Sequence, residues 1–295
     1  KRSVVELVDI RKKEILHKWV PDINKINNES KLNKKIIDLN KNFSENRYQI
    51  IHPLLLNDGS IIFHGMYSPL VKVDICSNLI WTIDDIFHHS IEKDNDDFIW
   101  VPTSKVDEDG IAVDYLTKIN DKGKILSKVS LKKLLNDINY PYLNVYAGND
   151  PFHLNDIQPI SKNIFEKGNY VLSMRNISSI AIYNEKENKI KKIKQGSWVH
   201  QHDIDEKENY FLFLDNNLSS EKSRVNSYNK IIVLDNDLNE VSEIYSEVLK
   251  NYKISTLTEG LIEIDRDKII FEETNNGALY KLSARGVDWL YTNFH

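Results

Sequence analysis

The sequence predicts an all-β fold, a six-bladed β-propeller with four-stranded blades of which the first is incomplete. Most segments are short runs of Val, Ile, Leu, Phe and Tyr bounded by Asn, Asp, Gly and Lys, which is typical of strands and turns. These runs recur in units of one order: a strand, a turn, an apolar strand, a third strand ending near Asp, a turn and a fourth strand. The units start about 35 to 65 residues apart, a spacing that suits propeller blades with variable loops.

The parts of the chain can be assigned in order. Residues 3–19 supply only two strands and are expected to be the incomplete first blade. Residues 22–46 are polar and rich in Lys and Asn, so we expect a long exposed crossing, whereas residues 131–138 have helical spacing and predict a short surface helix. The five full units span residues 52–84, 89–131, 153–196, 200–246 and 258–293. Because no low-complexity linker divides the chain, we expect one propeller domain over residues 1–295.

Turn residues support the strand assignment inside these units. Residues 54–63 and 118–126 are predicted hairpins, in which Gly59 and Gly123 supply the positive φ that such turns require.

Composition excludes several classes of protein. The chain has 295 residues, a net charge of −5 and no polybasic run, so we expect no nucleic-acid partner. Cys76 is the only cysteine, which excludes an internal disulfide, a zinc finger and a dithiol redox site, and we expect it to be a small buried hydrophobic residue in a strand. No run reaches the roughly 20 apolar residues of a membrane span. The chain begins at Lys1 without Met, so we expect a preceding segment such as a signal or an anchor.

Histidines recur where the units begin. When the units are aligned by their first strands, the position just before the strand is occupied by His52, His89, Asn155, His202 and Glu259. His153 and His200 recur two residues earlier, and with His88 six of the nine histidines lie at these starts. The first strand of a propeller blade is innermost, so these side chains are expected to converge on the central axis as a site. The alternative is that each residue caps a strand or forms a hydrogen bond, and recurs because the blades recur.

Arg175 strengthens the case for a site. It ends the apolar strand that starts at residue 170, and an Arg in that position needs an anionic partner because an unpaired buried cation is costly. Its guanidinium suits a tetrahedral oxyanion, although an ion pair with Asp156 or Asp203 is the alternative. Trp198 lies two residues before His200 and is either an aryl-binding wall or a packing residue.

Several motifs, taken together in order, resemble the arylsulfate sulfotransferases, bacterial enzymes with a six-bladed propeller that do not use the nucleotide sulfate donor PAPS. The resemblance spans nearly the whole chain. It is carried by residues 150–156 (Asp-Pro-Phe-His-Leu-Asn-Asp), 168–176 (Gly-Asn-Tyr-Val-Leu-Ser-Met-Arg-Asn), 201–203 (Gln-His-Asp), 212–216 (Leu-Phe-Leu-Asp-Asn) and the pair Ser223–Arg224.

The resemblance implies a sulfuryl transfer from a phenolic sulfate ester to a phenol through a sulfohistidine, with no cofactor and no metal. It makes His202 the nucleophile, with His200 as the alternative, and His89 or its neighbour His88 the proton donor and acceptor. The implied catalytic residues are His202, His89, His153, Asn155 and Arg175. The residues expected to bind substrate are His200, His88, His52, Trp198 and Glu259.

The expected partners are a small aryl sulfate donor and a phenolic acceptor, with a homodimer left open. Relatives of this kind are typically exported, so we expect a periplasmic location or an outward-facing membrane anchor.

Two other functions stay open at this point. Clustered histidines with Glu259 could bind Fe, Mn or Zn, with Asp156 and Asp203 as outer acceptors. The chain could also be a propeller that binds a ligand or a partner without catalysis.

Overall fold

The computed structural model describes residues 3–32, 37–142, 148–161, 168–217 and 228–292. It has an all-β fold with several four-stranded sheets, which confirms the predicted class. The chain forms two compact units, Lys1–Leu131 and Lys132–His295, and each is described by itself. The count of six blades and the single domain stay predictions.

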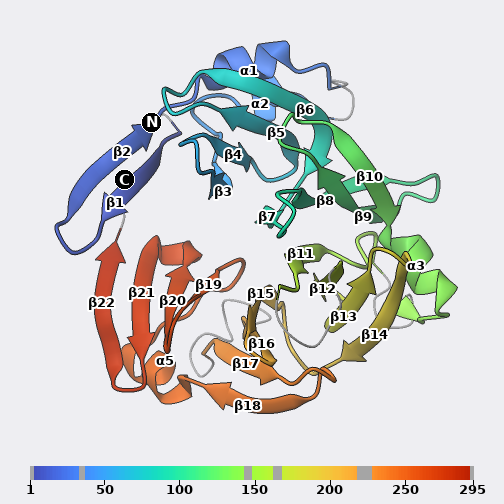
Figure 1. Cartoon of the computed structure of the whole chain (residues 1–295), viewed down its shortest axis with the longest axis vertical. Coiled ribbons are helices and arrows are strands. Elements are labelled where there is room, and N and C mark those ends of the chain that lie inside the picture. The colour runs from blue at the N-terminus through green and yellow to red at the C-terminus, as the bar shows by residue number, and fades with distance from the viewer. Residues whose placement is uncertain (1–2, 33–36, 143–147, 162–167, 218–227, 293–295) are drawn as a thin grey trace. The chain divides into compact units, whose positions relative to one another are not determined.

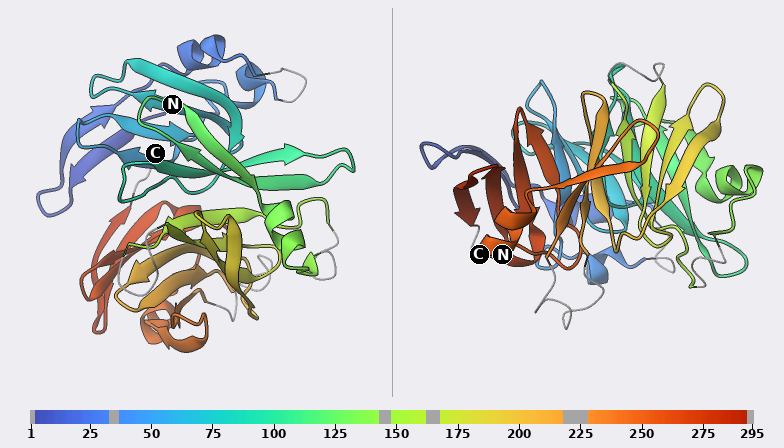
Figure 2. Two further views of the ribbon diagram at one scale, coloured as in Figure 1. Left: turned by 45° about the vertical axis from the view of Figure 1, so that its right-hand side comes forward. Right: turned by 90° about the horizontal axis from the view of Figure 1, so that it is seen from below.

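The first unit begins with the two strands expected from residues 3–19. β1 (Val5–Asp9) and β2 (Glu14–Trp19) form a two-stranded antiparallel sheet. The crossing expected at residues 22–46 is mostly exposed or half-buried where the structure describes it, but it contains two short helices that were not predicted, α1 (Ile23–Glu29) and α2 (Leu39–Asn42). Both helices are capped by an aspartate, and they lie beside the strands of the first unit (Figures 1 and 2). Ile23 and Ile26 of α1 are buried in one cluster with Trp19.

The remaining strands of the first unit form a single sheet of eight strands. They are β3 (Ile51–Leu55), β4 (Ile61–His64), β5 (Ser68–Val73), β6 (Leu79–Phe87), β7 (Glu92–Lys93), β8 (Ile99–Val106), β9 (Ala112–Ile119) and β10 (Ile125–Ser130). Both predicted hairpins are present, with φ of 80° at Gly59 and 76° at Gly123. Two predicted units are joined here, because Phe87 of β6 pairs with Thr103 of β8.

The second unit contains three four-stranded antiparallel sheets that follow the predicted units. The first is β11 (Leu154–Pro159), β12 (Asn169–Met174), β13 (Ser179–Asn184) and β14 (Lys189–Gln195). The second is β15 (His202–Lys207), β16 (Tyr210–Asp215), β17 (Lys230–Leu234) and β18 (Glu240–Ile244). The third is β19 (Ile262–Asp265), β20 (Lys268–Glu273), β21 (Ala278–Ser283) and β22 (Gly286–Thr292).

Contacts between these three sheets bring their first strands together. β11 contacts β15 and β15 contacts β19, while β14, β18 and β22 are the opposite edges of their sheets (Figure 1). The core lies between the sheets and includes Trp198, Phe211 and Phe213 in one cluster and Phe271 in the next. The starts of the first strands are therefore neighbours within the second unit.

Three local features complete the fold. The helix predicted at residues 131–138 is confirmed as α3 (Leu131–Asp137), and a further helix, α5 (Ser246–Tyr252), was not predicted. The expectation that Cys76 is buried is wrong. It is exposed in the turn between β5 and β6, where Asp74 accepts a hydrogen bond from the backbone N–H of Asn78. No helix in the described ranges has the length and apolar character to cross a membrane.

Candidate functional site

Five strand starts share an unusual backbone conformation. The left-handed positions are His52, His89, His153, His200 and Glu259, with φ between 41° and 58°. A residue other than glycine is uncommon in this region and costs free energy there. The predicted alignment, which placed Asn155 and His202 at the same position as His52, His89 and Glu259, is therefore corrected. The shared conformation occurs two residues earlier, at His153 and His200. Other non-glycine residues of the chain share this conformation, but at these strand starts four of the five carry an imidazole.

In the second unit, His153 connects a carboxylate to Arg175. Asp150 Oδ2 lies 2.5 Å from His153 Nδ1, and His153 Nε2 lies 3.0 Å from Arg175 Nη1. The carboxylate accepts the Nδ1–H, so the neutral ring presents its Nε2 lone pair to the guanidinium N–H. His153 thereby fixes the direction of Arg175.

His202 is held in one tautomer by Asn216. The amide Nδ2 of Asn216 donates to the carbonyls of Thr256 (3.0 Å) and Glu259 (2.9 Å), so its Oδ1 must face the His202 Nδ1 at 2.7 Å. The carbonyl of His200 lies 2.8 Å from the same nitrogen. Both neighbours are acceptors, so Nδ1 carries the proton and the lone pair of the neutral ring is on Nε2.

The electrostatics of this group favour the neutral forms of His202 and His200. Burial lowers the pKa of His202 to about 3, and the nearby Arg175 and His153 lower it further against the opposing bond to Asn216. The pKa of His200 is lowered by burial and by the same two neighbours. The pKa of Glu259 is raised by burial, although Arg175 opposes this shift. His153, Arg175, His200, His202 and Glu259 thus interact electrostatically within one unit. We name these five residues the Arg175 cluster.

Other residues at the strand starts join neighbouring sheets. Asn155 Nδ2 donates to the carbonyl of Gln201 at 2.8 Å. Asp156 accepts from the backbone N–H of Ile204 at 3.0 Å, and Asp203 accepts from that of Ile262 at 2.6 Å. Through these contacts the two aspartates join neighbouring sheets. Asn155 keeps a second amide N–H beyond this bond, as its expected role requires.

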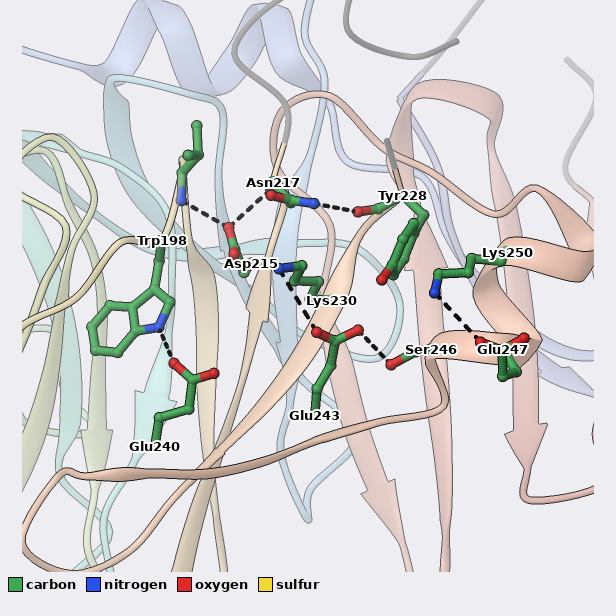
Figure 3. A network of polar contacts seen from close by, with 11 residues as sticks. Trp198, Asp215, Asn217, Tyr228, Lys230, Glu240, Glu243, Ser246, Glu247 and Lys250 are labelled. Carbon is green, nitrogen blue, oxygen red and sulfur yellow. Dashed lines mark hydrogen bonds and ion pairs between the residues drawn. The ribbon is translucent and has the colours of Figure 1, made fainter. Parts of the chain in front are cut away.

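A polar network holds the segment just before His200, through Trp198 and the backbone of Val199 (Figure 3). Asp215 Oδ1 accepts from the backbone N–H of Val199 (2.8 Å) and of Asn217 (2.9 Å). Trp198 packs its ring against Phe213 in the core and donates its indole N–H to Glu240 at 3.2 Å. The burial of Trp198 favours packing over the expected aryl-binding wall.

The first unit has its own group of buried imidazoles, which we name the His89 cluster: His52, His64, His88 and His89. His88 Nδ1 lies 2.8 Å from His89 Nδ1, and His52 Nδ1 lies 2.9 Å from the carbonyl of His89. Burial lowers the pKa of His52 to about 4 and that of His64 to about 3. His52, His88 and His89 belong to this unit, so their part in one site with the Arg175 cluster stays a prediction.

The sequence interpretation missed four residues that touch the predicted ones: His64, Asp114, Asp150 and Asn216. Asp150 had a local signal, because it lies three residues before His153. Asn216 ends the motif at residues 212–216, but nothing there pairs it with His202, and Asp114 had no signal, because these contacts cross between strands. The pair Ser223–Arg224 lies outside the described residues. Among the described residues, no group of three or more His, Cys, Asp or Glu side chains could hold a metal ion.

Comparison with known proteins gives one family and distant structural similarities. The model of the arylsulfotransferase (ASST) family matches residues 52–293. The chain is similar to BamB from Moraxella catarrhalis (8% identity, TM-score 0.47, covering 100% of this chain and 66% of that chain). It is also similar to the Dos1 propeller (11%, 0.48, 83% and 63%) and to the Pan2 WD40 domain of Neurospora crassa (11%, 0.47, 80% and 62%).

The matched part spans less than two thirds of each of these three chains. These similarities are too distant to carry an argument about fold or function. No curated protein matches the chain.

Proposed function

The chain belongs to the arylsulfotransferase (ASST) family, and we propose from this premise that it transfers a sulfuryl group from a phenolic sulfate ester to a phenol, with His202 as the nucleophile. The observation that carries the proposal is the arrangement of Asn216 around His202. It places the ring proton on Nδ1 and the lone pair on Nε2 of a neutral imidazole, in electrostatic range of Arg175.

The first half of the reaction forms a sulfohistidine. Nε2 of His202 attacks the sulfur of the ester, the N–S bond forms and the S–O bond to the aryl oxygen breaks. The electron pair leaves on that oxygen, which is a moderate leaving group because the conjugate phenol has a pKa near 10. The ring gains positive charge, which is stabilised because the Nδ1–H donates to the Asn216 oxygen and the His200 carbonyl.

The second half returns the enzyme to its starting state. The oxygen of an acceptor phenol attacks the sulfur and loses its proton, the N–S bond breaks and the electron pair returns to Nε2. Arg175, directed by Asp150 and His153, supports the charge on the equatorial oxygens in both halves, as in phosphoryl transfer. The second N–H of Asn155 can add a hydrogen bond to the same oxygens. The resemblance assigns the proton transfers to His89. We propose that the reaction uses no PAPS. We also propose that the protein is exported.

The test is a transfer assay with 4-nitrophenyl sulfate and phenol as acceptor. We expect acceptor-dependent release of 4-nitrophenol, ping-pong kinetics and a protein mass increase of one SO3 group, about 80 Da, when the acceptor is omitted. His202→Ala should lose the release and the mass increase together, whereas His200→Ala should keep the mass increase. No acceptor-dependent release by the wild-type protein would sink the proposed function. Retention of the sulfated species in His202→Ala would move the nucleophile elsewhere.

A further inference from the structure

The buried pair His88–His89 in the first unit has a third member, Asp114. Asp114 Oδ1 lies 3.4 Å from His88 Nε2, and both side chains are almost completely buried, at 2% and 1% exposure. The other nitrogen of His88, Nδ1, lies 2.8 Å from Nδ1 of His89. The three side chains therefore form an ordered line from a carboxylate through one imidazole to the next.

We propose that Asp114 and His88 are positioning residues that hold the proton of His89 on Nδ1 and so present its Nε2 as a proton acceptor. This inference rests on the proposed assignment of His89 to proton transfer. Among the described residues, His88 Nε2 has no hydrogen-bond partner, but it faces Asp114 Oδ1 at 3.4 Å. An oxygen that can only accept favours the His88 tautomer with its proton on Nε2, and the lone pair of a neutral His88 is then on Nδ1. Nδ1 of His89 must in turn be the donor, and the lone pair of His89 is left on Nε2.

The surroundings of the pair hold this geometry. The ring of Tyr67 is stacked on His88, with centroids 5.2 Å apart and an interplanar angle of 29°. It meets His89 edge-on, at 6.4 Å and 87°. His89 has a left-handed backbone conformation. Its carbonyl oxygen lies 2.9 Å from His52 Nδ1 and 3.1 Å from His64 Nε2. Both rings are thus constrained in place, so the position of the proton is the variable that Asp114 controls.

Asp114 would orient the imidazole of His89 as the carboxylate of a catalytic triad does, but with the imidazole of His88 between them. When His89 accepts a proton on Nε2, its Nδ1–H continues to donate to His88, and the charge is spread toward Asp114. When His89 returns the proton to a departing phenolate, the line resets to its starting arrangement. General acid–base catalysis of this kind typically contributes about 10²–10⁴-fold to a rate.

The direct test is the tautomer of His89, read from ¹⁵N chemical shifts of the full chain labelled with ¹⁵N-histidine and assigned with a His89→Gln variant. We expect a protonated Nδ1 and an unprotonated Nε2 in the wild type. Asp114→Leu, which removes the acceptor, should lose this preference. Asp114→Asn, which keeps a neutral acceptor oxygen, should retain most of it. His64→Gln is the matched control in the same cluster and should leave the His89 tautomer unchanged. A wild-type His89 with its proton on Nε2 overturns the proposal.

Kinetics supply a second, separable readout. His88→Phe preserves the stacking on Tyr67 but removes both nitrogens, and we expect kcat to fall about 10²-fold with phenyl sulfate. The loss should be smaller with 4-nitrophenyl sulfate, whose leaving group needs less protonation, and KM should change little. Equal losses on the two donors would contradict the relay even if the variant folds. If the wild type transfers no sulfuryl group at all, the proposed function fails, while the tautomer measurement still decides the relay.

Discussion

The Arg175 cluster and the His89 cluster use the same backbone device and differ in what faces it. Each unit places histidines in the left-handed conformation at its strand starts, His52 and His89 in the first and His153 and His200 in the second. In the second unit the imidazoles interact with the guanidinium of Arg175, which also interacts with Glu259. In the first unit they face each other, backbone carbonyls and Asp114.

The difference teaches that a repeated fold can repeat a position without repeating its chemistry. A cation beside neutral imidazoles with directed lone pairs suits an anionic substrate and a nucleophile. A line of imidazoles ending at a carboxylate suits the movement of a proton. The three predictions below separate the two clusters, first by activity and then by their response to pH.

The largest effect is expected at Arg175. Arg175→Ala should lower kcat/KM for 4-nitrophenyl sulfate by about 10²–10³-fold, because it removes a preorganised hydrogen-bond donor that stabilises the charge on the transferred sulfuryl group. Arg175→Lys should recover only part of this, since an ammonium lacks the planar fork that Asp150 and His153 direct. The measurement is the initial rate of acceptor-dependent phenol release. His64→Gln, a buried substitution in the other cluster, is the control. A loss in Arg175→Ala no greater than in this control would refute the distinction between the clusters.

How much of this contrast is visible in the sequence depends on the range of the contacts that produce it. The strands and hairpins are local features, marked by alternating apolar residues and by turns such as the one at Gly59, and they could be predicted. The helices in residues 22–46 were missed because each is only a few residues long, although Asp22 and Asp38 cap them and α1 buries Ile23 and Ile26 at helical spacing.

The candidate site divides in the same way. The histidines could be found because they recur with the units, and Arg175 because a cation ends an apolar strand. The partners that set their tautomers, such as Asn216 for His202, are far away in sequence or on another strand, and no local pattern marks them. The left-handed backbone at His153 and His200 also leaves no signal, since glycine is absent from both positions.

A second prediction concerns acid stability and the His89 cluster. Burial lowers the folded-state pKa of His64 to about 3, whereas an unfolded histidine titrates near 6.5. Between these values the unfolded state binds more protons, so this group makes stability fall as pH falls. From pH 7 to pH 5 the loss is about 2 kcal/mol for one such group. His64→Gln, which does not titrate, should reduce the pH dependence of the unfolding free energy by this amount in urea titrations. An unchanged slope would mean that the pKa of His64 is the same in the folded and unfolded states.

The smallest expected effect is at Asp215, which accepts a hydrogen bond from the backbone next to His200. Its effect on the pH dependence of stability has the opposite sign. Burial raises the pKa of Asp215 to about 6 from 3.8. Between these values the folded state binds more protons, so this group favours folding at pH 5 over pH 7 by about 1 kcal/mol. Asp215→Asn keeps an acceptor oxygen for the N–H groups of Val199 and Asn217 and removes the buried charge, so the variant should be more stable at pH 7 and should lose this contribution to the slope. The measurement is urea unfolding at both pH values, with kcat as a check that the His200 turn is intact. A variant destabilised at pH 7 would show that the charge itself, through its bonds to the two N–H groups, holds the turn.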